Sequence, residues 1–279
     1  MIQNSYNDTP TLYLIPTPIG NLEDITYRAV KVLEEVDVIF SEDTRVTLNL
    51  LNNFGIKNKL ISLHEHNEDV VKIQVLEYLK NGSSVGLVTD RGTPIISDPG
   101  YKTVKYVSDN GYNVVALPGA TAFACALVTS GISPQPFLFY GFLNSKDSKK
   151  REELELLKEN EYTMVFYEAP HRIIKTLNMM LEVFGNREIS ISREITKKFE
   201  SIYRGKLEDV IKIVPEKGEF VIVVEGNKLS NIDFNLSIKE AVDLYIKNGF
   251  DVMTSIKKVA KDRKISKNEI YKEYHGKDD

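Results

Sequence analysis

The chain has 279 residues, enough for one large domain or two ordinary ones. With 42% hydrophobic and 27% charged residues it has the composition of a soluble globular protein, and no apolar run approaches the roughly 20 residues that cross a bilayer. The net charge of −4 gives no general attraction to nucleic acid. The single cysteine, Cys125, cannot form an internal disulfide, and residues 1–10 carry no apolar signal core. These features predict a cytoplasmic protein without a membrane span.

Short apolar runs alternate with helical patterns over the first 133 residues. Strands are predicted at residues 12–15, 36–40, 60–63, 85–88 and 114–117, and helices at 27–35, 46–54, 69–80, 101–110 and 121–130. Thr26 can cap the first helix, and a glycine follows the expected end of several others. This alternation indicates a parallel α/β sheet. We expect a flexible N-terminus over residues 1–10 and an N-terminal α/β domain over 11–133.

Pro134 and Pro136 break this pattern, and we place a domain boundary there. In the C-terminal α/β domain, residues 134–230, strands are predicted at 137–142, 163–167, 188–192, 199–203 and 219–225, with a charged, exposed helix at 148–160 and another at 173–184. Because this half has fewer parallel crossovers, we expect a mixed sheet.

The last residues, 236–279, are predicted to form a helical tail. Ser237 with Glu240, and Ser266 with Glu269, each match the capping-box pattern. Three short helices fit, at about 237–248, 253–262 and 266–275.

Four loops that follow strands of the first half are rich in Gly, Pro, Asp, Ser and Thr. They are residues 16–21, 41–45, 89–100 and 118–122. In a parallel sheet all four lie at one edge, where such loops bring backbone groups close to a ligand. We therefore expect one small-molecule site built largely from backbone groups.

Several common kinds of site are poorly supported. The dinucleotide fingerprint, the phosphate loop and the nucleophile elbow of hydrolases are all absent. His64 and His66 share a face of an extended segment, but nothing nearby repeats with the spacing of metal ligands. The carboxylates of Glu42, Asp43 and Glu65 could serve as bases or substrate clamps, or as capping and ion-paired groups.

Six separated motifs, in order, resemble those of the tetrapyrrole-methylase superfamily, in its branch of bacterial 16S ribosomal RNA (cytidine-2′-O)-methyltransferases. The motifs are LYLIPTPIGN (12–21), SEDTR (41–45), DRGTPIISDPG (90–100), LPG (117–119), FYEAPHR (166–172) and REITK (193–197). The resemblance extends from about Leu12 to Gly226, and the tail is also similar. It implies two α/β domains with S-adenosylmethionine between them, a homodimer, no metal, and 16S rRNA of the 30S subunit as substrate.

The resemblance, together with the chemistry of the side chains, leads us to expect roles for single residues. Cofactor contacts are expected from Pro16, Ile19, Gly20, Asp90, Gly92, Thr93, Pro94, Gly119, Ala120, Thr121, Phe166 and Tyr167. Candidates for gripping the RNA are Asn21, Arg91, Glu168, His171, Arg172 and Lys197. The catalytic group comprises Asp43, Glu42, His66 and Arg45. Asp43 and Glu42 are the first candidates to receive the proton of the ribose 2′-OH, and His66 is the next candidate. Arg45 is expected to hold a phosphate.

The chain departs from the family pattern at two places. Arg91 stands where alanine is usual, and its side chain is expected to point either at an RNA phosphate or into solvent. Ala120 and Thr121 replace a commoner Pro-Ser pairing, which backbone contacts would tolerate. Two alternative functions stay open: C-methylation of a corrin or porphyrin precursor on the same fold, and a non-catalytic ribosome-binding protein.

Overall fold

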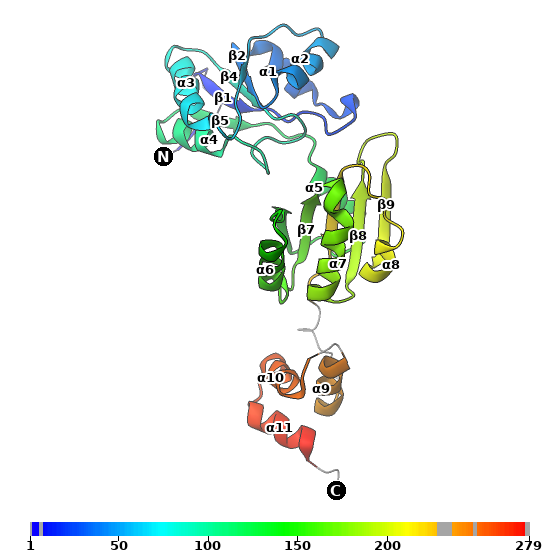
Figure 1. The fold of residues 1–279 in the computed structure, drawn as a ribbon. Helices are drawn as coiled ribbons and strands as arrows, with labels where there is room; N and C mark the ends of the chain where they lie inside the picture. The colour runs from blue at the N-terminus through cyan, green and yellow to red at the C-terminus, as the bar shows by residue number, and fades with distance from the viewer. Residues whose placement is uncertain (1, 6–7, 228–235, 248–249, 277–279) are drawn as a thin grey trace.

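The computed structural model describes residues 2–5, 8–227, 236–247 and 250–276. Two five-stranded sheets follow one another along the chain, and a group of three helices lies beyond the second sheet (Figure 1). Within these residues, no helix is both long enough and apolar enough to span a membrane.

The first sheet is entirely parallel, as predicted. Its strands are β1 (Thr11–Leu14), β2 (Val38–Ser41), β3 (Leu60–Ser62), β4 (Val85–Val88) and β5 (Asn113–Ala116). They run in the order β3-β2-β4-β1-β5, and Leu12 pairs with Val85 on one side and Val114 on the other. Because all five strands point the same way, the loops after them meet at one edge of the sheet.

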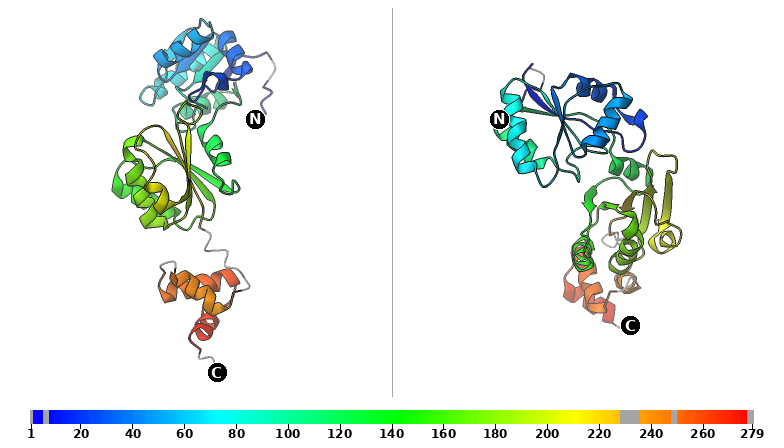
Figure 2. Two further views of the ribbon diagram at one scale, coloured as in Figure 1. Left: turned by 90° about the vertical axis from the view of Figure 1, so that its right-hand side faces the viewer. Right: turned by 45° about the horizontal axis from the view of Figure 1, so that its top comes forward.

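Helices cover both faces of this sheet (Figure 2). On one face α1 (Tyr27–Glu35) and α2 (Thr44–Asn53) pack on Ile39 and Val115, and on the other α3 (Glu68–Lys80) and α4 (Tyr101–Asp109) pack on Val38 and Phe40. The side chains of successive residues of β2 thus point to opposite faces of the sheet, as the two-residue period of a strand requires. Thr26 caps α1 as expected, accepting a hydrogen bond from the Ala29 amide at 3.0 Å.

The second sheet is mixed, also as predicted. Its strands are β6 (Phe137–Phe142), β7 (Thr163–Glu168), β8 (Glu188–Arg193), β9 (Ser201–Lys206) and β10 (Phe220–Val224), in the order β6-β7-β10-β8-β9. Only the β6–β7 pair of this sheet is parallel. Strand β9 begins at Ser201 rather than at Phe199, where we predicted its start. The residues between Arg193 and Ser201 form a tight turn first.

Helices also cover both faces of the second sheet. On one side lie α6 (Asp147–Leu157), α7 (Ile173–Phe184) and α8 (Leu207–Ile211), with the short 3-10 helix η2 (Pro170–Arg172) leading into α7. On the other side α5 (Ala122–Thr129) packs on Val165, Val221 and Val223.

The packing of α5 differs from our expectation that it belongs with the first sheet. The sequence of this helix, AFACALVT, is apolar nearly all round. It therefore carries no polar face that would indicate which sheet it covers.

The tail has a small core of its own. Its helices are α9 (Ile238–Lys247), α10 (Val252–Arg263) and α11 (Lys267–His275), and the side chains of Val242, Ile256 and Ile270 meet between them. Both capping boxes are present, since the Glu240 and Glu269 amides donate to the Ser237 and Ser266 hydroxyls and the two carboxylates accept in return. The prediction of three helices is confirmed.

Candidate active site in the cleft between the sheets

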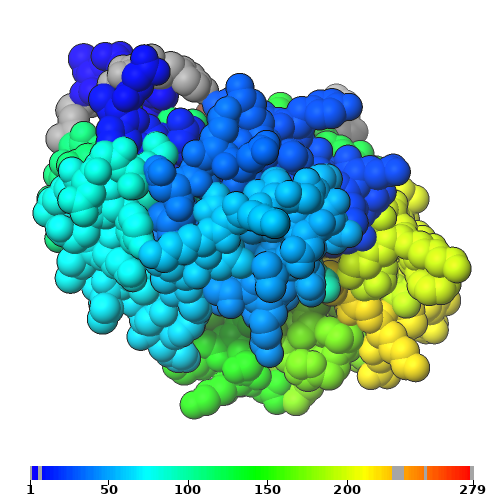
Figure 3. Space-filling view, turned by 90° about the horizontal axis from the view of Figure 1, so that it is seen from above, coloured from blue at the N-terminus to red at the C-terminus, as the bar shows by residue number. Residues whose placement is uncertain are grey.

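The four loops expected to form a site do lie at one edge of the first sheet, and that edge faces the second sheet (Figure 1). Seen from the first-sheet end, the first domain overlies part of the second (Figure 3). Two of the loops are joined by a two-way backbone bridge, in which Thr17 and Gly92 each donate to the other's carbonyl at 2.9 and 3.0 Å. The Thr17 hydroxyl also donates to the Thr89 carbonyl at 3.1 Å.

A cavity of about 380 Å³ lies between the two sheets. The first half contributes Ile19, Gly92, Thr93, Asp98 and Thr121 to its lining, and the second contributes Phe142, Tyr167, Pro170, Ile195 and Phe220, among others. Both sides therefore offer apolar contact, the first also carries hydroxyl groups and Asp98, and the second also carries Glu219. A pocket of this kind suits a small ligand that has both polar and apolar parts.

Five of the residues expected to contact a cofactor line this cavity: Ile19, Gly92, Thr93, Thr121 and Tyr167. The Thr93 and Thr121 hydroxyls are 2.8 Å apart, and the Thr93 hydroxyl also donates to the Ala120 carbonyl at 3.1 Å. The loop after β4 and the loop after β5 are thus locked together at the cavity wall.

Other expected cofactor residues hold the loops rather than line this cavity. Pro16 and Gly119 pack so closely that a Cβ added to Gly119 would lie 2.5 Å from the Pro16 Cβ. Pro94 is buried within its own loop. The Asp90 carboxylate accepts a hydrogen bond from the Asp43 amide at 3.0 Å, which joins the loops after β4 and β2.

Phe166 corrects our expectation for the second domain. Its side chain is fully buried in the core beneath α7, whereas Tyr167 lines the cavity. Neighbouring residues of a strand point to opposite faces, so the two side chains cannot both reach the cleft.

A second cavity of about 410 Å³ lies beside the first. It is lined by Thr17, Gly20, Thr47, Asn49, Asp90, Arg91 and Lys197, among others. Lys197 lies across Gly20, where an added Cβ would meet the Lys197 Cγ at 2.5 Å. Glycine at position 20 therefore lets a lysine of the second domain cross the first loop.

The Arg91 side chain is 54% exposed, so it reaches solvent as one of our two expectations had it, and it also has a partner within the protein. Its guanidinium forms an ion pair with Glu219, the residue before β10, on the other side of the cleft. The same carboxylate accepts from Lys197 Nζ at 2.9 Å, and Lys197 is also 3.1 Å from Glu194. Ion pairs thus join the loop after β4 of the first sheet to the loops that carry Lys197 and Glu219 in the second domain.

Asp43, our first candidate for a base, is engaged by Arg45. It is the N-cap of α2, and its Oδ1 accepts from the Arg45 amide at 2.9 Å and from Arg45 Nε at 3.0 Å. A second guanidinium nitrogen is 2.6 Å from Oδ2. These hydrogen bonds lower the pKa of Asp43 to about 2. So acidic a carboxyl group is a poor proton acceptor, and this geometry disfavours the role that we expected.

Sequence reasoning missed Asp98, although it lies in the loop after β4. Its carboxyl group is half-buried at the cavity, close to Glu42, Asp90 and the Thr89 hydroxyl. Burial, reinforced by the two neighbouring carboxylates, raises the pKa of Asp98 to about 6. The pattern Ser97-Asp98-Pro99-Gly100 looked like an ordinary turn, in which aspartate is common.

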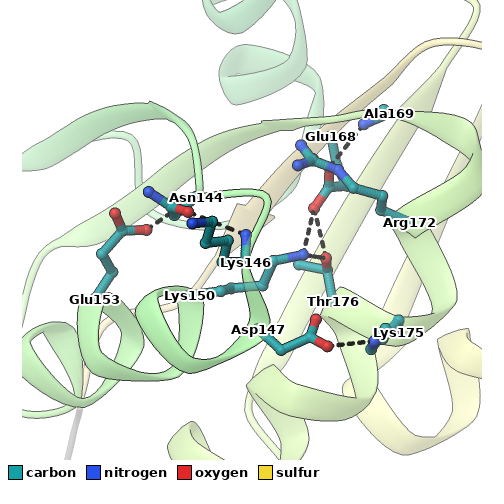
Figure 4. Close-up of polar contacts among 10 residues, drawn as sticks. All are labelled: Asn144, Lys146, Asp147, Lys150, Glu153, Glu168, Ala169, Arg172, Lys175 and Thr176. Atoms are coloured by element: carbon teal, nitrogen blue, oxygen red, sulfur yellow. Dashed lines mark hydrogen bonds and ion pairs between the residues drawn. The ribbon is translucent and has the colours of Figure 1, made fainter.

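Glu168 is a structural residue, contrary to the RNA contact that we expected for it (Figure 4). Its side chain is 1% exposed, and its carboxylate accepts from the Ala169 amide, the Thr176 hydroxyl and Arg172 Nε at 2.8, 2.5 and 2.8 Å. Lys150 Nζ lies 3.4 Å away and is equally buried. The α6 helix, which we expected to be exposed, thus inserts one lysine into the core.

The remaining candidates lie around the mouth of the cleft or outside it. Arg172 is held by Glu168, and its neighbour His171 is exposed. Asn21 caps a short 3-10 helix at Leu22–Asp24, accepting from the Glu23 amide at 3.1 Å. His66 is exposed in the turn before α3, with its ring 6.0 Å from that of His64. No cluster of three or more metal-ligating side chains occurs in the part of the chain that the structure describes.

Comparison with known proteins identifies the class. The family model for Tetrapyrrole (Corrin/Porphyrin) Methylases matches residues 11–211. The crystal structure of the methyltransferase CobJ superposes with a TM-score of 0.59 at 18% identity, covering 78% of this chain and 95% of that one. A uroporphyrin-III C-methyltransferase from Thermus thermophilus, complexed with S-adenyl homocysteine, gives 0.54 at 18% identity, with 76% and 96% covered. The chain belongs to the tetrapyrrole methylase family and is a methyltransferase.

Relatives at higher identity share one name. A protein of Bacillus subtilis (strain 168) is 47% identical over 98% of this chain and 96% of its own length. One of Buchnera aphidicola subsp. Schizaphis graminum is 41% identical over 96% of both. Each is named ribosomal RNA small subunit methyltransferase I. The resemblance seen in the motifs is therefore confirmed over nearly the whole chain.

Proposed function

We propose that this chain transfers the methyl group of S-adenosylmethionine to the 2′-oxygen of a cytidine ribose in 16S rRNA of the small ribosomal subunit. The observation that carries the proposal is the 47% identity, over almost the full length, to a protein named as a ribosomal RNA small subunit methyltransferase. The same relatives favour RNA over a corrin or porphyrin ring, because the uroporphyrin-III and cobalt precorrin-4 methyltransferases of known structure compared here share only 17–18% identity with this chain.

The cavity between the sheets suits the cofactor. The Thr93 and Thr121 hydroxyls and the backbone around Gly92 offer hydrogen bonds, and Ile19, Phe142 and Phe220 offer apolar contact. Gly92 has φ of +85°, and a Cβ at that position would lie 3.1 Å from Ile19. The backbone can therefore approach a ligand closely only because this residue is glycine. When bound, S-adenosylmethionine supplies a methyl group that its sulfonium charge has already activated.

The chain's own work is mainly positioning. A ribose oxygen must be held in line with the bond that breaks, at near-attack distance, and kept from competing water. Arg45 and Arg172 are suited to gripping phosphates, because a guanidinium offers a planar fork of donors. Their carboxylate partners, Asp43 and Glu168, fix the two guanidinium groups in advance.

The test is methyl transfer to the proposed substrate. Purified protein with tritiated S-adenosylmethionine should label 16S rRNA in 30S subunits from cells that lack this gene, and nuclease mapping with mass spectrometry should identify 2′-O-methylcytidine. Label entering a uroporphyrinogen-type ring instead would support the C-methyltransferase alternative. Binding of 30S subunits without any transfer would support the non-catalytic one.

We also propose that the protein acts as a cytoplasmic homodimer, as the family resemblance implies. Light scattering on the purified full chain should give twice the monomer mass of 31.7 kDa. Fractionation of cells that express the tagged chain should place it with the ribosomes.

A further inference from the structure

The second cavity adjoins the one that suits the cofactor. Arg91 is part of the lining of both, so a group held in the second cavity would lie beside a cofactor in the first. The second cavity is bounded by helix α2 and by the loops after β1 and β4. Its volume of about 410 Å³ is within the usual range for small-ligand pockets, roughly 300–1,000 Å³.

One face of α2 forms a wall of this cavity. Val46, Asn49, Leu50 and Asn53 follow one another at intervals of one helical turn or less, so they lie on one side of the helix. Val46 is 41% exposed, and Leu22, which the loop after β1 brings to the same cavity, is 45% exposed. Exposed aliphatic groups beside uncharged amides suit a flat ring that has apolar faces and a hydrogen-bonding edge. A nucleobase is such a ring.

The charges around the cavity compensate one another. Arg91 is paired with Glu219, and Lys197 Nζ is within 3.1 Å of carboxylate oxygens of both Glu219 and Glu194. Asp90 adds a further carboxylate to the lining. A phosphate is bound best by cations whose charge is not already neutralised. The cavity therefore favours an uncharged base over a phosphate.

The Asn53 amide has a fixed orientation. Its Nδ2 donates to the Asn49 backbone carbonyl at 2.8 Å. A carbonyl can only accept, so the atom bonded to it must be the amide nitrogen, and the amide oxygen is left as an acceptor. Cytosine carries an amino group at the position where uracil carries an oxygen acceptor. A fixed acceptor at this wall therefore favours cytosine over uracil.

The wall has further hydrogen-bonding groups to offer. The Asn49 side chain has no hydrogen-bond partner within the described residues, and it lies one helical turn from Asn53, at a spacing of about 5–6 Å. Its amide can both donate and accept, so it can bond to the acceptors N3 and O2 of a cytosine. Thr47 also lines the cavity and is buried, and no described residue bonds to its hydroxyl. Buried polar groups are normally paired, so this one also points to a ligand.

The helix that carries these amides is held to the loop after β4. Asp43 is the N-cap of α2, and its amide donates to Asp90 Oδ1 at 3.0 Å. Residues of that loop line both cavities. The amide wall is thus fixed with respect to the cavity that suits the cofactor, as a site that selects one base requires.

We propose that the second cavity holds the base of the cytidine whose ribose is methylated, and that Asn49 and Asn53 recognise its Watson–Crick edge. Asn53 accepts a hydrogen bond from the N4 amino group, and Asn49 donates to N3 or O2. Val46 and Leu22 contact the ring. The ribose then lies towards Arg91, where the two cavities meet. Both asparagines are specificity-determining residues and take no part in the chemistry. This inference rests on the proposed function.

Two preparations of 30S subunits that differ only at the mapped target position, cytidine or uridine, test the proposal. The wild-type kcat/KM should be at least about tenfold higher for cytidine. Asn53→Ala should lower the value for cytidine and not that for uridine, so that the ratio falls towards one. Asn49→Ala should lower both values several-fold, because an amide can turn to bond with either base. Asn52→Ala changes a neighbouring, exposed asparagine outside the lining and should change neither value.

Two further measurements separate base recognition from folding and from cofactor binding. Thermal melts of Asn49→Ala and Asn53→Ala should match that of Asn52→Ala, and calorimetric titration should show S-adenosylmethionine affinity within a few-fold of wild type. Cofactor affinity lost in parallel with activity would assign the cavity to the cofactor and overturn the proposal. A wild-type ratio in Asn53→Ala would overturn it too, and in that case the proposed function would stand. If the wild-type protein labels neither preparation, the proposed function itself fails and this inference falls with it.

Discussion

Arg91 and Glu219 form an ion pair across the cleft, although they belong to different sheets and are 128 positions apart in the chain. Both side chains are more than half exposed, at 54% and 57%. A pair so exposed contributes little to stability, at most about 1 kcal/mol. The pair matters more for the charge at the cleft, since the single carboxylate of Glu219 contacts two cations there, Arg91 and Lys197.

Glu219→Gln should strengthen binding of 30S subunits at low salt. The change frees Arg91 to meet a phosphate and leaves Lys197 paired with Glu194 alone, so affinity should rise several-fold and fall more steeply as salt increases. Filter binding between 50 and 200 mM salt measures both effects. Glu208→Gln, an exposed carboxylate on α8, is the control and should change neither. Weaker binding by Glu219→Gln would show that the pair is needed to orient Arg91.

Lys150→Met should destabilise the protein by about 2–4 kcal/mol, because it leaves the buried Glu168 carboxylate without its lysine. Urea unfolding followed by circular dichroism measures the loss. Lys149→Met changes the neighbouring, exposed lysine and should cost less than about 0.5 kcal/mol. Equal losses in the two variants would mean that the buried pair has no special role. Combining Lys150→Met with Glu168→Gln should recover part of the loss.

Gly92→Ala and Gly55→Ala form a matched pair. Both glycines have left-handed backbones, with φ of +85° and +70°, so each substitution should cost about 1 kcal/mol of stability. Only Gly92 lines the cavity, so only Gly92→Ala should weaken binding of S-adenosylmethionine, by about tenfold or more. Thermal melts and calorimetry report the two quantities. Similar cofactor affinity in both variants would contradict the placement of the cofactor beside Gly92.

Asp43→Ala should lower the stability of the protein, because α2 loses its N-cap. Asp43→Asn should cost less, since an amide oxygen still caps the helix. The pKa of Asp43 is lowered in the folded protein, so its contribution is present above about pH 4 and is lost as the pH falls towards 2. The gap between Asp43→Ala and wild type should therefore narrow on acidification, which melts at pH 7 and pH 3 would show.

The contribution of Asp98 to stability has the opposite pH dependence to that of Asp43. Its folded pKa of about 6 lies above the ordinary aspartate value of 3.8, so the folded state holds the proton more tightly. Stability due to Asp98 is present below about pH 4 and is lost as the pH rises through 6. Asp98→Asn should thus gain stability relative to wild type between pH 5 and 7. A constant difference across that range would place Asp98 in a more polar setting than the structure shows.

Local patterns were enough to predict much of the fold. Apolar runs, glycine stops and capping residues act over a few neighbours, so the parallel sheet, the mixed sheet and the three tail helices could be predicted. The partner of α5 could not, because that helix is apolar on every side. The two-residue period of a strand would have separated Tyr167 from Phe166 had it been applied to β7.

The candidate site was predictable only in outline. Loops after parallel strands indicate where a cleft lies, and several of the expected residues line it. The burial of Lys150, the partner of Arg91 and the setting of Asp98 depend on groups brought together by tertiary packing. No spacing along the chain encodes those contacts. The sequence therefore could not show that Lys150, a residue type that is usually exposed, is buried.

In the described part of the chain, every strand of the first sheet precedes every strand of the second, so the backbone crosses between the sheets once. Around the cleft the two halves are otherwise held together by side-chain contacts, including Lys197 lying over Gly20. A change in the spacing of the two halves would therefore break no strand pairing in either sheet.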